Sequence, residues 1–275
     1  MNRTELRERT AQPWAPSPLL YASGAVHLGA VVAALLRPGL WPWSVGALVA
    51  NHAVLSAVSL WPKSDWLGPN ITELPEGCDK AVAITIDDGP DPEVTPLVLD
   101  LLDQSQVKAT FFCIGCKVLR YAEVAQEIVR RGHSIENHTQ RHRHNFSLLG
   151  PKGMSREIGA AQDSIAKVTG SAPRFFRAPA GLRNPFLDPV LAHHGLKLAS
   201  WTRRGFDTVN GDADSVLRRL THDLQGRDIL LLHDGHAARG GAGRPVILDV
   251  LPPLAAAVQS QGLKTVSLRA ALPCE

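Results

Sequence analysis

Two neighbouring carboxylates, Asp87 and Asp88, follow an apolar run that covers Val82–Ile86. Buried carboxylates cost free energy unless they are paired or bound to a metal ion. A polar turn is the structural alternative, because the following Gly89 and Pro90 both favour turns. The pair is therefore a candidate for acid–base or metal chemistry.

A second candidate is the pair His138 and His142, four residues apart. Imidazoles at this spacing can converge on one ion if the segment coils. The alternative is a histidine-rich stretch without a ligand, since His133 and His144 are close in sequence. With Asp88, however, the pair completes a two-histidine, one-carboxylate set, which is typical of a catalytic metal with open positions for water and substrate.

Three further polar side chains stand after other apolar segments. Arg177 can pair with a carboxylate and fix its charge state, although a surface arginine in a proline-rich turn is the alternative. Asp207 follows Trp201 at a short interval, and His233 ends the apolar run Ile229–Leu232. A histidine on such a rigid support can act as a general acid, and a purely structural histidine is the alternative.

These side chains require elements that bring them together, and the pattern from Lys80 onward alternates between strand-like and helical segments. The predicted strands are Val82–Asp87, Ala109–Ile114, Ser134–Asn137, Arg174–Arg177, Lys197–Trp201, Ile229–His233 and Thr265–Leu268. The predicted helices are Thr95–Gln104, Tyr121–Arg131, Lys152–Val168, Pro185–His194, Asp214–Leu224 and Val246–Ser260. Such alternation predicts an α/β fold, a distorted (β/α) barrel with about seven parallel strands. The chemistry of such folds gathers at the carboxyl ends of the strands, where the polar residues fall.

The region from Lys80 to Leu268 resembles the polysaccharide deacetylase family, also called carbohydrate esterase family four. The family's five motifs occur in order, at Thr85–Gly89, His138–His142, Arg177–Gly181, Trp201–Thr208 and Leu231–Asp234. The resemblance implies an enzyme that removes an acyl group from an N-acylated amino sugar with a divalent metal, zinc being the expected ion.

The resemblance also implies a role for each matching residue. Asp87 would be the catalytic base, with Asp88, His138 and His142 as metal ligands and Arg177 positioning the base. The backbone N–H of Ala180 would help to bind the oxyanion, and Trp201 would belong to the substrate site. His233 would be the general acid, tuned by Asp207.

The fourth motif departs from the family pattern. Arg204 stands where the family often has an aspartate, and Thr208 stands where it has a second tryptophan. Glu136 and Arg143 are further departures near the second motif. The changes at Arg204 and Thr208 imply an altered groove for the polymer, and all four changes bear on the substrate more than on the chemistry.

The N-terminal region has a different character. Pro18–Leu36 carries no charged side chain apart from a single histidine, and as a helix it would span about 28 Å, close to the hydrocarbon thickness of a bilayer. A second apolar run covers Leu40–Leu60, with Trp41, Trp43 and Trp61 at its flanks. We predict a membrane helical hairpin over residues 18–62, after a tail over 1–17 and before a linker over 63–79 and a catalytic domain over 80–275. The alternatives are two buried helices, or one spanning and one interfacial helix; a cleaved signal peptide is disfavoured.

The side of the membrane depends on how many segments span it. Arg3, Arg7 and Arg9 precede the first segment, which favours a cytoplasmic N-terminus at a bacterial inner membrane. Two spans return the catalytic domain to the cytoplasm, whereas a single span places it outside. An inward domain suits a lipid-linked sugar or glycolipid, and an outward domain suits peptidoglycan or an exported polysaccharide.

Composition excludes several other classes of protein. Among the 275 residues the net charge is only +3, and the basic residues are dispersed, so nucleic acid is not an expected partner. The four cysteines are too few for a disulfide scaffold, and Cys113–Cys116 is either a redox or zinc half-site or two small residues at the end of a strand. The rival functions are a deacylase of small amides or esters, and a non-catalytic saccharide-binding barrel.

Overall fold

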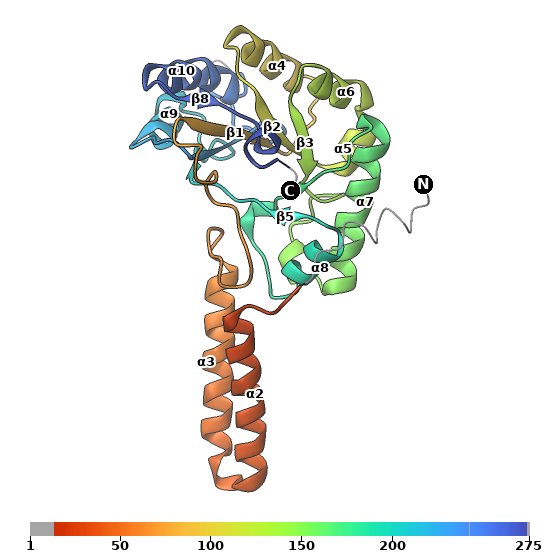
Figure 1. Ribbon diagram of the computed structural model, residues 1–275, viewed down its shortest axis with the longest axis vertical. Helices are drawn as coiled ribbons and strands as arrows, with labels where there is room; N and C mark the ends of the chain where they lie inside the picture. The colour runs from red at the N-terminus through yellow and green to blue at the C-terminus, as the bar shows by residue number, and fades with distance from the viewer. Residues whose placement is uncertain (1–13, 242, 274–275) are drawn as a thin grey trace.

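The computed structural model describes residues 14–241 and 243–273, and its centre is a curled, parallel sheet (Figure 1). The strands are β1 Ala81–Asp87, β2 Ala109–Cys113, β3 Ser134–Asn137, β4 Phe175–Phe176, β5 Lys197–Leu198, β6 Arg203–Arg204, β7 Ile229–His233 and β8 Lys264–Thr265. Their order is β5-β4-β3-β2-β1-β7-β6, with β8 pairing β1. The predicted α/β class and parallel strands are confirmed, and β5 and β6 remain unpaired with each other, so the barrel is open.

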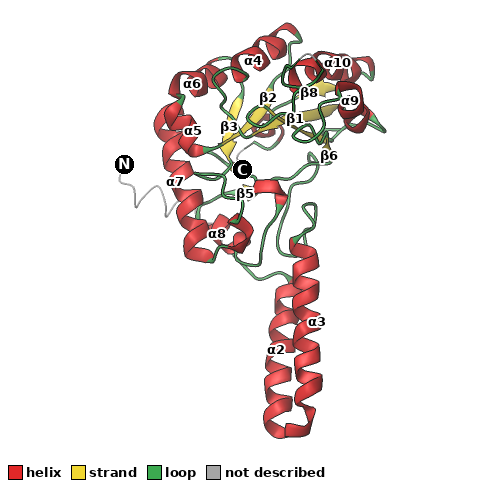
Figure 2. Cartoon of the chain, turned by 180° about the vertical axis from the view of Figure 1, so that it is seen from behind, coloured by secondary structure: helices red, strands yellow, loops and turns green. Residues whose placement is uncertain are grey.

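Helices form an outer arc around the strands (Figure 2). They are α4 Thr95–Gln104, α5 Gly115–Arg120, α6 Ala122–Arg130, α7 Pro151–Thr169, α8 Leu187–His193, α9 Ala213–Thr221, α10 Ile247–Ser260 and α11 Leu268–Ala271. Short 3₁₀ turns occur at η1 Pro38–Leu40, η2 Phe146–Leu148 and η3 Pro179–Gly181. The sequence missed α5, β6 and α11. The predicted strand Thr265–Leu268 ends early, because Ser267 caps α11 by accepting a hydrogen bond from the backbone N–H of Ala270.

The alternation along β1 decides which side chains reach the site. Ile84 and Ile86 pack in the apolar core that also contains residues of the outer helices. Side chains alternate along a strand, so Thr85 and Asp87 lie on the concave face. On that face Phe112 and Leu231 form part of a second apolar cluster.

The open side of the barrel is partly closed by a segment outside the predicted catalytic domain. Ile71 bridges Ala199 in parallel, and Glu73 bridges Asp228 in antiparallel fashion. Leu74 is fully buried. Residues of the predicted linker therefore pack on the domain, while the domain boundaries themselves remain predictions.

The first part of the described chain is a helical hairpin, α2 Pro18–Leu36 and α3 Trp41–Ser59. The two helices lie side by side and project from the domain (Figures 1 and 2). Of the helices that the structure describes, α2 alone is both long and apolar enough to cross a membrane. The predicted pair of helices is present, and the membrane spans themselves remain predictions. The predicted tail falls mostly outside the described residues.

Candidate metal centre and catalytic pocket

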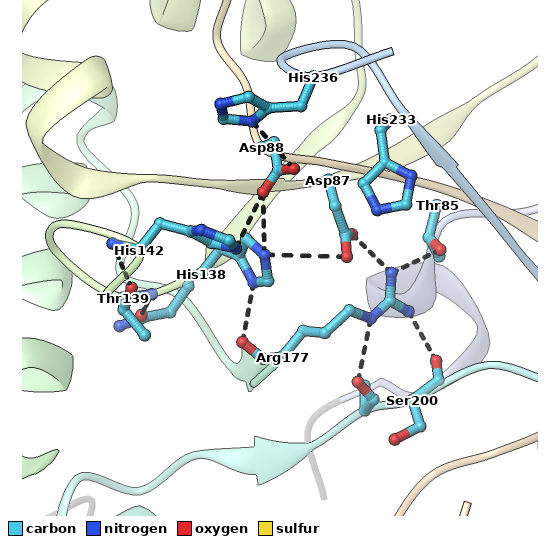
Figure 3. Close-up of polar contacts among 12 residues, drawn as sticks. Thr85, Asp87, Asp88, His138, Thr139, His142, Arg177, Ser200, His233 and His236 are labelled. Atoms are coloured by element: carbon cyan, nitrogen blue, oxygen red, sulfur yellow. Dashed lines mark hydrogen bonds and ion pairs between the residues drawn. The ribbon is translucent and has the colours of Figure 1, made fainter. Parts of the chain in front are cut away.

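The loops that follow the strands surround a cavity of ≈ 490 Å³. The cavity is lined by seven of the predicted site residues, namely Asp87, Asp88, His138, His142, Ala180, Trp201 and His233. The other two, Arg177 and Asp207, lie behind this lining and contact it. All nine therefore belong to one site, although they come from five segments of the chain. Figure 3 shows six of them, namely Asp87, Asp88, His138, His142, Arg177 and His233.

Asp88, His138 and His142 form the candidate metal centre. One donor atom from each lies within 4.8 Å of the others. Asp88 Oδ1 is 3.3 Å from His138 Nε2 and 3.2 Å from His142 Nε2, and Figure 3 shows the three side chains converging. Asp88 Oδ1 is also buried without a hydrogen-bond partner among the described residues. An orphaned carboxylate oxygen facing two imidazole nitrogens fits a divalent cation such as Zn²⁺.

The protonation states of these ligands also suit a cation. Burial by itself would raise the pKa of Asp88, but close contacts with His138 and His236, and the charge of His138 and His142, hold that pKa well below its usual range. Burial and the neighbouring His138 lower the pKa of His142 to about 4. A carboxylate and a neutral imidazole are the forms that bind metal.

Local backbone geometry explains why residues 138 and 142 meet. Thr139 and His142 adopt left-handed φ values of 65° and 49°, which coil the segment after β3. The Thr139 hydroxyl accepts a hydrogen bond from the His142 N–H at 2.9 Å. His138 Nδ1 lies 2.9 Å from the Arg177 carbonyl oxygen, and donation to that oxygen leaves Nε2 for the cation.

Arg177 fixes the second carboxylate, Asp87. Its Nη1 donates to Asp87 Oδ1 at 2.7 Å and to Thr85 Oγ1 at 2.7 Å, while Nη2 donates to the Ser200 carbonyl at 2.6 Å. The guanidinium also stacks on Phe112 at 4.0 Å. Asp87 Oδ1 is thus hydrogen-bonded to Arg177. Asp87 Oδ2 lies 4.0 Å from His138 Nε2, toward the metal centre.

His233 lies on the other side of Asp87, since the two are register partners on β7 and β1. Asp207 accepts two hydrogen bonds from it, from the ring Nδ1 at 2.9 Å and from the backbone N–H at 2.7 Å. Burial by itself would lower the pKa of His233, but the hydrogen bond and charge of Asp207, with Asp87 and Asp88, raise it overall. The arrangement favours an imidazolium whose Nε2 is the atom left for the pocket.

The sequence analysis missed other pocket residues. His236 Nδ1 lies 3.2 Å from Asp88 Oδ2, and Lys117 Nζ donates to the Asp88 carbonyl at 2.8 Å. The short interval between His233 and His236 was a usable signal. Lys117 gave none, because it lies on α5, which no pattern predicted.

The departures from the family pattern separate into two groups. Arg204 and Thr208 line the cavity, as the predicted change of groove requires. Glu136 does not: its carboxylate is buried, pairs with Arg269 Nε at 2.5 Å and accepts the Arg174 N–H at 2.7 Å. Glu136 therefore anchors α11 and takes no part in the lining of the cavity.

Cys113 and Cys116 do not form a joint redox or metal site. Cys113 is a free, buried thiol in the apolar core, and burial raises its pKa well above the usual value. Cys116 is free and exposed on α5. For Cys113, the prediction of a small residue at the end of a buried strand is confirmed.

Comparisons with known proteins agree with this geometry. A family model for polysaccharide deacetylase matches residues 75–199. A peptidoglycan-N-acetylglucosamine deacetylase of Bacillus cereus is 32% identical over 192 residues, which cover 69% of this chain and 87% of that protein. A chitooligosaccharide deacetylase of Bradyrhizobium is 34% identical over 158 residues, covering 57% of this chain and 72% of that protein.

The fold comparison gives the same result. The solved structure of a peptidoglycan N-acetylglucosamine deacetylase superimposes with a TM-score of 0.68 at 25% identity, covering 75% of this chain and 94% of that one. Similarity of this extent, over sequence and fold together, shows that the chain belongs to the polysaccharide deacetylase family, carbohydrate esterase family four.

Proposed function

We propose that this enzyme removes the N-acetyl group from an amino sugar of a cell-envelope saccharide, with Zn²⁺ as its metal. One observation carries the proposal. Asp87 and His233 are paired across adjacent strands, beside the cluster of Asp88, His138 and His142. A base and an acid next to a metal centre suit the hydrolysis of an amide. Relatives named for deacetylating peptidoglycan and chitooligosaccharides support the substrate class.

Asp87 acts as the base. Arg177 occupies Asp87 Oδ1, so Oδ2 accepts the proton of the attacking water. The ion pair with Arg177 fixes the orientation of this carboxylate. A bound Zn²⁺ would lower the pKa of water and polarise the acyl oxygen.

His233 acts as the acid. Its Nδ1 is held by Asp207, so Nε2 carries the proton that the departing amine needs. Ala180, held at a φ of 55° on the pocket wall, presents its backbone N–H to the developing oxyanion.

Replacing Asp87 by Asn tests the base assignment. We expect acetate release to fall by at least about 100-fold, because general-base catalysis is lost while the metal ligands remain. Acetate release from N-acetylchitooligosaccharides and bound zinc are measured on the full chain in detergent. Asp79→Asn, an exposed carboxylate just before the same strand, is the matched control and keeps full activity. Full activity of Asp87→Asn would refute the assignment.

The rival functions make different predictions. A deacylase of small amides or esters releases acetate or formate from small substrates and leaves N-acetyl oligosaccharides intact. A non-catalytic saccharide-binding barrel binds saccharides and releases nothing. A panel of N-acetyl and N-formyl sugars, assayed before chelation, after chelation and after zinc is restored, separates the three.

We also propose that the hairpin anchors the enzyme in the membrane. Its apolar side chains point outward; Leu28, Leu35 and Val49 are 68%, 75% and 63% exposed. Two of its serines, Ser23 and Ser44, are buried, and Asn51 Nδ2 donates to Ser23 Oγ at 2.9 Å. This inside-out pattern is typical of helices in lipid.

Tryptophans mark both ends of the hairpin. Trp41 and Trp43 lie at its tip, and Trp61 and Trp66 lie where it joins the domain. All four are more than half exposed, as interfacial anchors are in membrane proteins. The spacing fits α2, whose length is about 28 Å.

The position of the domain follows from the hairpin. A hairpin with two spans returns the chain to its starting side, and Arg3, Arg7 and Arg9 favour a cytoplasmic start. We therefore expect a reporter fused to the C-terminus to show a cytoplasmic location. An active alkaline phosphatase fusion, which requires export, would instead place the domain outside.

A further inference from the structure

A second cavity of ≈ 550 Å³ lies beside the catalytic pocket, and its lining is basic. Arg203, Arg204, Arg218, Arg219 and His222 line it, and no carboxylate does. Arg204 lines both cavities, so the second cavity adjoins the catalytic pocket at this side chain.

One of these side chains, Arg203, is held by contacts within the protein. Arg203 Nε pairs with Asp228 Oδ2 at 2.5 Å. Its two other nitrogens donate to the backbone carbonyls of His222 and Asp223. Arg203 therefore shapes the cavity rim and is not available to a ligand.

Arg204 and Arg219 are different, because neither has an ion-pair partner in the described part of the chain. Their guanidinium carbons lie 5.0 and 5.4 Å from the centre of the same Phe206 ring. Arg204 also stacks on Trp201 at 5.4 Å, and its Nε is buried without a hydrogen-bond partner. Two like charges gathered at one ring repel each other, and a bound anion would relieve that repulsion.

Arg218, the third arginine of the lining, is loosely held. Arg218 Nη2 is 4.0 Å from Asp212 Oδ2, and both side chains are mostly exposed. Phe206 itself adopts a left-handed φ of 59°, which is strained for a bulky residue. This conformation places the ring between the catalytic pocket and α9, with 43% of the residue exposed.

We propose that Arg204 and Arg219, assisted by Arg218, form a subsite for a phosphate or carboxylate group carried by the saccharide. The substrate class is then an anionic amino-sugar saccharide, whose anion lies away from the N-acetyl group. Figure 1 shows α9, which carries Arg218 and Arg219, at the end of the domain remote from the hairpin. The anion therefore belongs to the saccharide rather than to a lipid headgroup. The inference rests on the proposed deacetylase function.

The test compares a neutral N-acetylchitooligosaccharide with the same oligosaccharide carrying one phosphate, using the full chain in detergent at low salt. The wild type should favour the phosphorylated substrate in kcat/KM. Arg219→Gln should lower the ratio of the two kcat/KM values by about tenfold, mainly through KM, because a charge-assisted pair is lost. Arg156→Gln, an exposed arginine on α7 that lines neither cavity, is the charge-matched control and keeps the ratio.

The outcomes separate the two proposals. A ratio that Arg219→Gln does not change overturns the anion subsite and leaves the deacetylase function standing. If neither substrate releases acetate, the deacetylase function fails, and calorimetry with inorganic pyrophosphate decides the subsite. Weaker pyrophosphate binding by Arg219→Gln supports it, and equal binding overturns it.

An experiment with lipid vesicles tests whether the arginines bind the anion of a lipid headgroup instead. Arg219→Gln and wild type are compared on the neutral substrate in vesicles of phosphatidylglycerol and of phosphatidylcholine. A loss confined to phosphatidylglycerol, with an unchanged ratio in detergent, assigns the cations to the membrane surface and overturns the saccharide subsite. Equal rates in the two lipids, with a lowered ratio in detergent, support it.

Discussion

Asp207 and His233 show how single residues set the chemistry of this pocket. A buried histidine would lose its proton easily, because burial disfavours the charged form. Asp207 reverses this by accepting hydrogen bonds from both the ring and the backbone of His233. The pKa of His233 is consequently raised rather than lowered.

Replacing Asp207 by Asn should move the alkaline limit of activity. His233 acts in its protonated form, which is lost as the pH rises through its pKa. Without the charge of Asp207 that pKa falls, so the alkaline limb of kcat/KM shifts to lower pH, and the maximal rate drops by about tenfold or more. The pH profile of acetate release measures both effects. Asp79→Asn should leave the profile in place, and an unshifted limb in Asp207→Asn would argue against His233 as the acid.

At the scale of elements, the loop between β4 and α8 depends on the end of the hairpin. Arg183 is buried in this loop; its N–H donates to the Ser59 carbonyl at 3.3 Å and its guanidinium donates to the Ser64 carbonyl. Ser200 Oγ also donates to the Pro62 carbonyl at 2.8 Å. The same loop carries Ala180, so the end of the hairpin and the start of the predicted linker support one wall of the pocket.

Gly181→Ala should damage both stability and activity. A Cβ at this position would lie 2.6 Å from Trp201 and 2.7 Å from Pro62, at a φ of 74°. We expect a loss of about 1–3 kcal/mol in the free energy of unfolding, and a lower kcat as Ala180 shifts. Thermal unfolding in detergent and acetate release measure these.

Gly170→Ala is the matched control for this prediction. Gly170 has a φ of 72°, but no atom lies within 4 Å of the added Cβ. It should lose only about 1 kcal/mol from the left-handed backbone, with full activity. Equal effects of the two substitutions would mean that packing against the hairpin end does not matter.

The whole molecule combines two regions with opposite surface character. The domain has an apolar core, whereas the hairpin exposes most of its apolar side chains and buries Ser23, which Asn51 contacts. The end of the hairpin accepts a hydrogen bond from Ser200, next to the pocket residue Trp201, so the proposed anchor directly contacts the segment that supports the site.

Leu28→Lys should weaken membrane insertion. Leu28 is 68% exposed near the middle of α2, and a lysine at the centre of a spanning helix costs about 3 kcal/mol. The chain should shift from the carbonate-resistant membrane fraction to the soluble or aggregated fraction. Leu148→Lys, on the domain surface with 83% exposure, should not shift it. Identical fractionation of the two variants would contradict a lipid-facing α2.

The sequence alone determined much of this enzyme. Their apolar runs located β1 and β7, because an apolar run that ends in a polar residue is readable locally. The motifs identified Asp88, His138 and His142, which the structure brings within 4.8 Å. α4 was predicted with the bounds that the structure gives it.

Only the tertiary structure decided which side chains face the pocket. Glu136 and Arg204 both depart from the family pattern, yet Glu136 pairs with Arg269 and Arg204 joins two cavities. β6, of two residues, is too short to show a period, and its pairing with β7 comes from packing. The left-handed turn at Phe206 and the contact of Pro62 with Gly181 depend on segments distant in the chain. Local patterns specify elements, whereas loop conformations between elements follow from the contacts that surround them.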